Sequence, residues 1–254
     1  SNQPEHEKVD FRNNVIYNWG ANNVYGAEGG NYNMVGNYYK PGPDSANRNR
    51  LIQPYADDGK NAQTKGTYGR IYLSGNYVEG NSTVSNNNRA GVHLHNTFST
   101  HAPGVTLNDV VVAEEFTVAE AKTYSAIEAY DKVLKNAGSS KMRDAIDTRL
   151  IEEVKTNTPQ FIGMSELNSA PYPKRGIIDS QEDLRPKGES TSWSAWPDLQ
   201  SGDLLVDSDN DGMPDAWEIS KGLDPETPDA NGRHLSTAYD NIEVYLNELA
   251  EKIE

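Results

Sequence analysis

Asparagine recurs at equivalent points of three short segments in the first third of the chain, and this repeat constrains the fold most. In each segment an Asn-Asn or Gly-Asn pair ends a run of strand-forming residues; the segments are residues 11–15, 33–38 and 72–77. Asn14 and Asn37 are 23 residues apart, and Asn37 and Asn76 are 39 apart. The second interval therefore fits one period plus an insertion, which we place in the polar stretch 41–66.

A period near 23 residues is typical of one coil of a right-handed parallel β-helix. An asparagine at the same bend of every coil can hydrogen-bond the coils above and below it, which satisfies its buried amide. An antiparallel meander with Asn-Gly-type turns is the alternative, but asparagines that recur in register favour stacked coils. The sequence thus predicts a mainly β fold: the C-terminal coils of a right-handed parallel β-helix with flanking α-helices.

The pattern becomes helical after residue 117. Ser125 and Glu128 form a capping box, Gly138 is a suitable C-cap, and a second helical pattern runs from Ile146 to Val154. We expect three regions in the chain, which are β-helix coils in 1–105, a helical and irregular segment packed on them in 106–200, and a calcium-binding loop with C-terminal helices in 201–254.

The charge balance limits the classes of partner. The net charge is −15 and there is no basic stretch, which argues against a nucleic-acid partner. No apolar run is long enough to span a membrane. The chain also lacks cysteine, so disulfides are excluded.

The sequence from Asp207 to Glu218 matches the calcium loop of an EF-hand in full. Calcium takes six to eight oxygen ligands, and this loop spaces them suitably, with a glycine at the sharp turn. The expected ligands are Asp207, Asp209, Asp211, the carbonyl of Met213, Asp215 at the ninth position and Glu218. The alternative is an acidic turn that only caps the next helix, and the full ligand set disfavours it.

No entering helix is expected before this loop, because residues 201–206 have an extended pattern. We therefore predict a single structural calcium site that is EF-hand-like. A signalling sensor would need paired sites and an apolar groove. A last helix is expected from about Asp240.

Several stretches resemble the pectate lyases of polysaccharide lyase family 1, in the form found in gut Bacteroidetes. The similar stretches cover most of the chain in a matching order; they are residues 9–19, 25–30, 37–43, 126–138, 143–145, 176–180 and the calcium loop. The resemblance implies a secreted, cell-surface or periplasmic bacterial enzyme that cleaves polygalacturonate by β-elimination. In that reaction calcium acidifies the C5 proton of the uronate, and an arginine acts as the base.

The resemblance places the catalytic calcium ligands and the base arginine on coils before Val9, and we expect them upstream of Ser1. We therefore assign no catalytic base to this chain. Arg12 lies in a strand beside the asparagine row, where a structural role is favoured. The expected partners are an acidic polysaccharide and the N-terminal half of the same protein.

What this chain would contribute is the downstream wall of the substrate groove. Residues 24–28 and 67–70 are expected on the sheet that faces the substrate. The groove candidates are Tyr25, Glu28, Lys40, Tyr68 and Arg70, and surface exposure without substrate contact is the alternative for each.

Other side chains are assigned structural roles. His93, His95 and His101 lack a third metal ligand at fixed spacing, so ordinary hydrogen-bonded histidines are favoured. Trp193 and Trp196 are expected to be buried. Two other functions stay open: a non-catalytic carbohydrate-binding or adhesion protein, and a glycoside hydrolase, for which Glu28 has no evident partner carboxylate.

Overall fold

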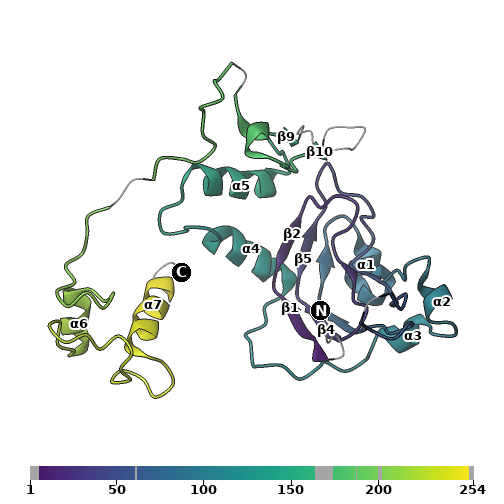
Figure 1. Cartoon of the computed structure of the whole chain (residues 1–254), viewed down its shortest axis with the longest axis horizontal. Coiled ribbons are helices and arrows are strands. Elements are labelled where there is room, and N and C mark those ends of the chain that lie inside the picture. The colour runs from purple at the N-terminus through teal and green to yellow at the C-terminus, as the bar shows by residue number, and fades with distance from the viewer. Residues whose placement is uncertain (1–5, 61, 164–173, 187, 200–201, 252–254) are drawn as a thin grey trace. The chain divides into compact units, whose positions relative to one another are not determined.

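The computed structural model describes residues 6–60, 62–163, 174–186, 188–199 and 202–251. The chain forms two compact units (Figure 1). The first comprises residues 1–138 and 145–196, and the second comprises residues 139–144 and 197–254. No described helix is long and apolar enough to cross a membrane.

The first unit is built on short parallel strands that recur in a fixed order along the chain. The first sheet contains β1 (Lys8–Arg12), β4 (Asn31–Val35) and β7 (Arg70–Ser74). The second sheet contains β2 (Val15–Tyr17), β5 (Tyr38–Lys40) and β8 (Tyr77–Val78). The third sheet contains β3 (Tyr25–Gly26) and β6 (Gln53–Pro54).

All pairings among these eight strands are parallel. In Figure 1, β1 lies beside β4 and β2 beside β5. An antiparallel meander is therefore wrong for this part of the chain, and the predicted parallel stacking is confirmed.

The core lies between the sheets and consists of the side chains that point inward from the strands. Alternate residues along a strand point to opposite faces, so each strand buries one row and leaves the other outside. The fully buried members of the row include Met34, Tyr39, Ile52, Ile71 and Val78.

The predicted stacking of asparagines is confirmed. The Asn37 side-chain oxygen accepts hydrogen bonds from the backbone and side-chain amides of Asn14, at 3.0 Å each. The Asn76 oxygen accepts the same pair from Asn37, at 3.1 and 2.8 Å. Asn88 extends the row, because its oxygen accepts from both amides of Asn76. The side chains of Asn37 and Asn76 are buried, so these bonds satisfy amides that water cannot reach.

Segment 114–124 covers the outward face of the first sheet. Asn33 on β4 exchanges two hydrogen bonds with the backbone of Phe116, and Asn13 exchanges two with the backbone of Tyr124. Arg12 pairs with Asp10 and with Glu115 of the segment. These side chains fasten the segment to the strands.

Helix α4 (Ala126–Asn136) covers the second sheet. Its predicted capping box is present, with Ser125 and Glu128 bonded to each other's backbone amides. Tyr130 stacks on Tyr38 of β5 at a centroid distance of 4.4 Å.

The remaining elements of the first unit are short, apart from α5. They are α1 (Ser82–Asn86), the 3₁₀ helices η2 (Asn88–Gly91) and η3 (Gln181–Leu184), α2 (Phe98–His101), α3 (Leu107–Val110), α5 (Ala145–Thr156) and the antiparallel pair β9 (Ile162–Gly163) and β10 (Lys174–Arg175). The sequence pattern places α5 correctly.

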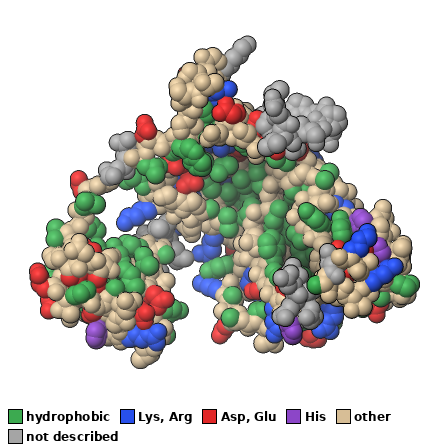
Figure 2. All heavy atoms as spheres, in the orientation of Figure 1, with side chains coloured by type: hydrophobic (Ala, Val, Ile, Leu, Met, Phe, Trp, Pro, Cys, Tyr) green, Lys and Arg blue, Asp and Glu red, His purple; other side chains and the backbone are tan. Residues whose placement is uncertain are grey.

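The second unit contains α6 (Asp215–Lys221) and α7 (Asn241–Glu251). Trp217 on α6 packs against Tyr245 on α7 at a ring distance of 5.0 Å, and its Nε1–H donates to Glu248. The surface around these two helices carries many carboxylates (Figure 2).

Candidate metal centre

The loop before α6 gathers the aspartates that the sequence singles out. Carboxylate oxygens of Asp207, Asp209 and Asp211 all lie within 4.8 Å of one another. Gly212 has φ of 96°, a left-handed conformation that glycine adopts without strain. Its amide donates to Asp207 at 3.0 Å, which curls the chain so that the three carboxylates converge.

Glu218 approaches the same cluster from α6. Its side chain is fully buried, and neither carboxylate oxygen has a hydrogen-bond partner among the described residues. Burial, followed by the repulsion of Asp209 and Asp211, raises the pKa of Glu218 to about 7. A buried carboxylate without a partner is costly unless a cation compensates it. One oxygen each of Asp207 and Asp209 is also buried without a partner.

A fifth carboxylate comes from outside the twelve-residue motif. Oxygens of Asp229, Asp211 and Glu218 lie within 4.8 Å of one another. The backbone amides of Asp229 and Ala230 donate to Asp211 at 2.9 and 2.8 Å, which holds this distant segment against the loop. Buried Asn241 in turn donates to the Asp229 carboxylate at 3.1 Å. Sequence reasoning missed Asp229 because it follows Asp211 by 18 residues and lies outside the twelve-residue motif.

One predicted ligand is placed differently. The Asp215 carboxylate accepts hydrogen bonds from the backbone amide and hydroxyl of Ser208, both at 2.8 Å. It therefore braces the loop and is not part of either carboxylate cluster. The Met213 side chain is fully buried, and its predicted ligand, the backbone carbonyl, stays a prediction.

The donor set is suited to a hard cation. All of the converging groups are carboxylates, and oxygen-only sites select calcium or magnesium over transition metals. Five carboxylates from two segments also suit calcium, which tolerates irregular geometry and high coordination number. The residues present therefore fit a calcium ion.

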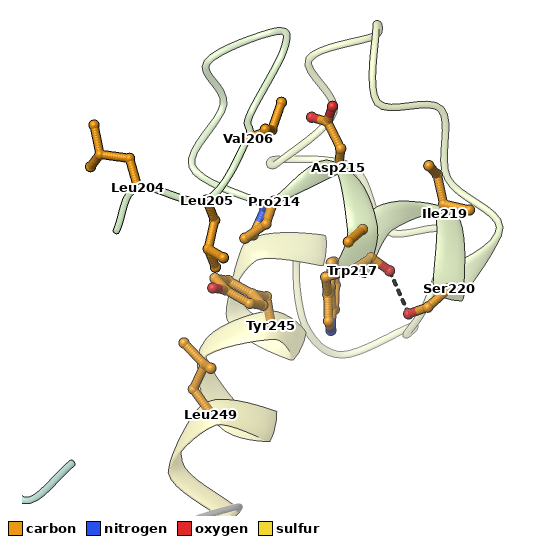
Figure 3. Close-up of a pocket in the computed structure, with 11 residues that line it drawn as sticks. Leu204, Leu205, Val206, Pro214, Asp215, Trp217, Ile219, Ser220, Tyr245 and Leu249 are labelled. Carbon is orange, nitrogen blue, oxygen red and sulfur yellow. Dashed lines mark hydrogen bonds between the residues drawn. The ribbon is translucent and has the colours of Figure 1, made fainter. Parts of the chain in front are cut away.

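The opposite side of α6 faces an apolar groove of about 750 Å³ (Figure 3). Trp217 and Tyr245 line it together with the exposed residues Leu204 and Leu205. Because Trp217 precedes Glu218 on the helix, the two side chains point to different sides. Residues 202–206 form no helix, as the sequence indicates.

The structure separates the five groove candidates. Tyr25 belongs to β3 of the third sheet, whereas Arg70 belongs to β7 of the first sheet and lies over the Phe116 ring. The expectation that residues 24–28 and 67–70 share one sheet is therefore wrong, because β3 pairs with β6. Tyr68 packs on Phe98, and Glu28 is half-buried.

Lys40 is placed in β5 and is buried beneath α4. Its ammonium pairs with Glu79 at 3.2 Å and bonds the hydroxyl of Tyr130 at 3.3 Å. An exposed groove position is thus wrong for Lys40, because Tyr130 closes over it.

The histidines and Arg12 have the structural contacts that were expected. Each of these three histidines has a hydrogen-bond partner: the carbonyl of Ala90 for His93, Thr97 for His95 and the carbonyl of Ala56 for His101. The expected burial of Trp196 is wrong, since this side chain is 72% exposed.

Comparison with known proteins relates the chain to fungal pectate lyases. No protein-family model matches it. Probable pectate lyase C of Aspergillus flavus is 32% identical over 246 residues, and those of Aspergillus oryzae and Aspergillus terreus are 31% and 30% identical. Each match covers 94% of this chain and 48% of the relative, so the chain spans about half the length of these relatives. The matches do not test the expected Bacteroidetes form, which stays a prediction.

Proposed function

We propose that this chain is part of a secreted pectate lyase that cleaves polygalacturonate by calcium-assisted β-elimination. The observation that carries the proposal is similarity to proteins named probable pectate lyase over 94% of the chain. The stacked parallel strands support it, because they match the fold that the family resemblance implies. The bacterial origin suggested by that resemblance is part of the proposal.

The strands belong, in this proposal, to a right-handed parallel β-helix that continues before β1. In the asparagine row, each side-chain oxygen accepts two bonds from the preceding coil. Within the described part of the chain, the Asn14 oxygen accepts no such pair. A preceding coil would supply those donors and would pair with β1 and β2. In this proposal the present chain forms the C-terminal coils, and the N-terminal half of the protein precedes it.

In this proposal, the upstream coils and the present coils have different roles in the reaction. The catalytic base and the catalytic calcium ligands belong to the upstream coils, and the present coils extend the surface along which the polymer lies. Arg12 is unsuited to act as the base, because Asp10 and Glu115 pair with its guanidinium and raise its pKa.

The carboxylate cluster of the second unit is proposed as an EF-hand-like structural calcium site. Asp207, Asp209, Asp211, Glu218 and Asp229 would hold the ion, which would neutralise carboxylates that otherwise repel one another. Calcium bound here would fasten the loop to α6. It would take no part in proton transfer, because the second unit carries its own compact set of ligands.

The proposal is tested on the full-length parent protein with polygalacturonate. β-Elimination leaves an unsaturated uronate at the new non-reducing end, so ultraviolet absorbance rises with each cleavage. The rise should stop when calcium is chelated. An increase in reducing ends without ultraviolet absorbance would show a hydrolase instead. Retention on polygalacturonate with neither signal would show a non-catalytic binding protein.

A further inference from the structure

The three sheets of the first unit differ in what covers their outward faces. Segment 114–124 covers the first sheet through Asn33 and Arg12, and α4 covers the second through Tyr130. On the third sheet, by contrast, the β3 residue Tyr25 is 62% exposed. The outward face of this sheet is therefore at least partly open to a partner.

The third sheet extends beyond β3 and β6 to the run of residues 92–95. Ile52 and Val92 form a parallel bridge, and the amide of His95 donates to the carbonyl of Pro54 at 2.9 Å. Ile52, Pro54 and Val92 are buried, so the residues that alternate with them face outward. These outward residues are Tyr25, Gln53, Tyr55, His93 and His95.

Three of these side chains form a row of rings that crosses the strands. The Tyr55 ring lies 6.1 Å from that of Tyr25 and 4.1 Å from that of His95. Tyr25 is 62% exposed. The rings of Tyr55 and His95 are half-buried beside it. Neighbouring strands lie about 4.8 Å apart, so an extended polymer that runs across them meets one ring in each coil. A row of rings at the surface suits the C–H faces of pyranose sugars, and the Gln53 amide can bond their hydroxyl groups.

The charge of this part of the chain permits an acidic polymer. Residues 1–113 contain nine Lys and Arg and nine Asp and Glu, whereas residues 114–254 contain 14 basic and 29 acidic residues. The whole net charge of −15 therefore belongs to the later part of the chain. The coils that carry the ring row are neutral overall and do not repel a polyuronate.

We propose that Tyr25, Tyr55 and His95 form a stacking platform for a polygalacturonate chain, with Gln53 and His93 as hydrogen-bonding partners at its side. This inference rests on the proposed function for the identity of the polymer. It replaces the earlier grouping of Tyr25 with Lys40 and Arg70, since those two side chains are engaged by Tyr130 and Phe116.

The test measures binding by the chain itself, with no cleavage required. Electrophoretic retardation is compared in gels that contain polygalacturonate or a neutral glucan, and dissociation constants are measured calorimetrically with oligogalacturonates. Tyr55→Ala should weaken oligogalacturonate binding about ten-fold, and the Tyr25→Ala/Tyr55→Ala double variant should weaken it further. Tyr239→Ala is the control for loss of a surface tyrosine, because Tyr239 is exposed like Tyr25 but lies in the second unit.

His95→Gln and Tyr55→Leu keep most of the local packing and guard against misfolding, which thermal unfolding also monitors. Unchanged affinity in folded Tyr55→Ala and Tyr55→Leu proteins would overturn the platform. Equal retardation by the neutral glucan would overturn the assigned polymer. If the parent protein fails to cleave polygalacturonate while Tyr55→Ala still abolishes retardation, the lyase proposal falls and the platform stands. If it cleaves with KM unaffected by Tyr55→Ala, the platform falls alone.

Discussion

The side-chain oxygen of Asn37 accepts two hydrogen bonds from Asn14, while its amide donates to Asn76 at 2.8 Å and to the carbonyl of Phe11 at 2.8 Å. One buried side chain thus links three successive repeats of the parallel strands. Both its oxygen and its amide nitrogen are satisfied without water.

Asn37→Ala should therefore destabilise the first unit strongly. The substitution leaves the backbone amide of Asn14 without its partner and removes one donor from the Phe11 carbonyl, at a cost of about 2 to 4 kcal/mol in the free energy of unfolding. Chemical denaturation measures the change. Asn86→Ala is the matched control, since Asn86 is exposed on α1 and outside the row. If Asn37→Ala lowered the free energy of unfolding no more than Asn86→Ala does, a stabilising role for the asparagine row would be contradicted.

Substitutions in the carboxylate cluster distinguish the ligands proposed from the structure from those of the sequence motif. Glu218→Gln and Asp229→Asn should each raise the calcium dissociation constant at least about ten-fold, because each removes a converging carboxylate. Asp215→Asn should have a smaller effect, because Asp215 bonds to Ser208. Calorimetric titration with calcium checks this order.

Glu226→Gln serves as the control for charge, since Glu226 is exposed and outside the cluster. If Asp215→Asn raised the calcium dissociation constant more than Asp229→Asn did, Asp215 would be the ligand at the motif's ninth position and Asp229 would not be a ligand.

Calcium removal should loosen the second unit and spare the first. Without the ion, Glu218 and its neighbouring aspartates repel one another, and α6 loses its fixed position beside α7. Hydrogen exchange should therefore accelerate in residues 207–229 and in α7 after chelation, while β4 and β5 stay protected. Accelerated exchange in β4 at the same calcium concentration would place the structural metal elsewhere.

Arg12 provides a test of where the catalytic base lies. In the parent enzyme, Arg12→Lys should leave kcat nearly unchanged, because the arginine pairs with Asp10 and Glu115. Its effect should appear instead as faster proteolysis of segment 114–124. A fall in kcat of several orders of magnitude would identify Arg12 as part of the reaction centre.

The asparagine row and the acidic loop were predictable because each rests on local spacing. Asn14, Asn37 and Asn76 each follow a strand of the first sheet, and those strands pair in parallel, so residues at equivalent points of the sequence repeat lie beside one another. Asn88 was not predictable in this way, because it follows Asn76 by only 12 residues and opens the 3₁₀ helix η2.

The assignment of side chains to sheets was not predictable from spacing alone. Residues 41–66 contain β6, which places Gln53 beside Tyr25 and leaves Arg70 to the first sheet. Lys40 was misplaced for a related reason, since its burial depends on Tyr130, which lies 90 residues later. Asp229 likewise joins the metal cluster through contacts that no local motif encodes.

Product analysis in isotopically labelled water tests the central claim most directly. The parent protein is incubated with polygalacturonate in H₂¹⁸O, and the oligomers are weighed by mass spectrometry. β-Elimination consumes no water, so the account predicts unsaturated products whose new ends carry no ¹⁸O from bond cleavage. Saturated products with one ¹⁸O incorporated at each cleavage would show hydrolysis and contradict it.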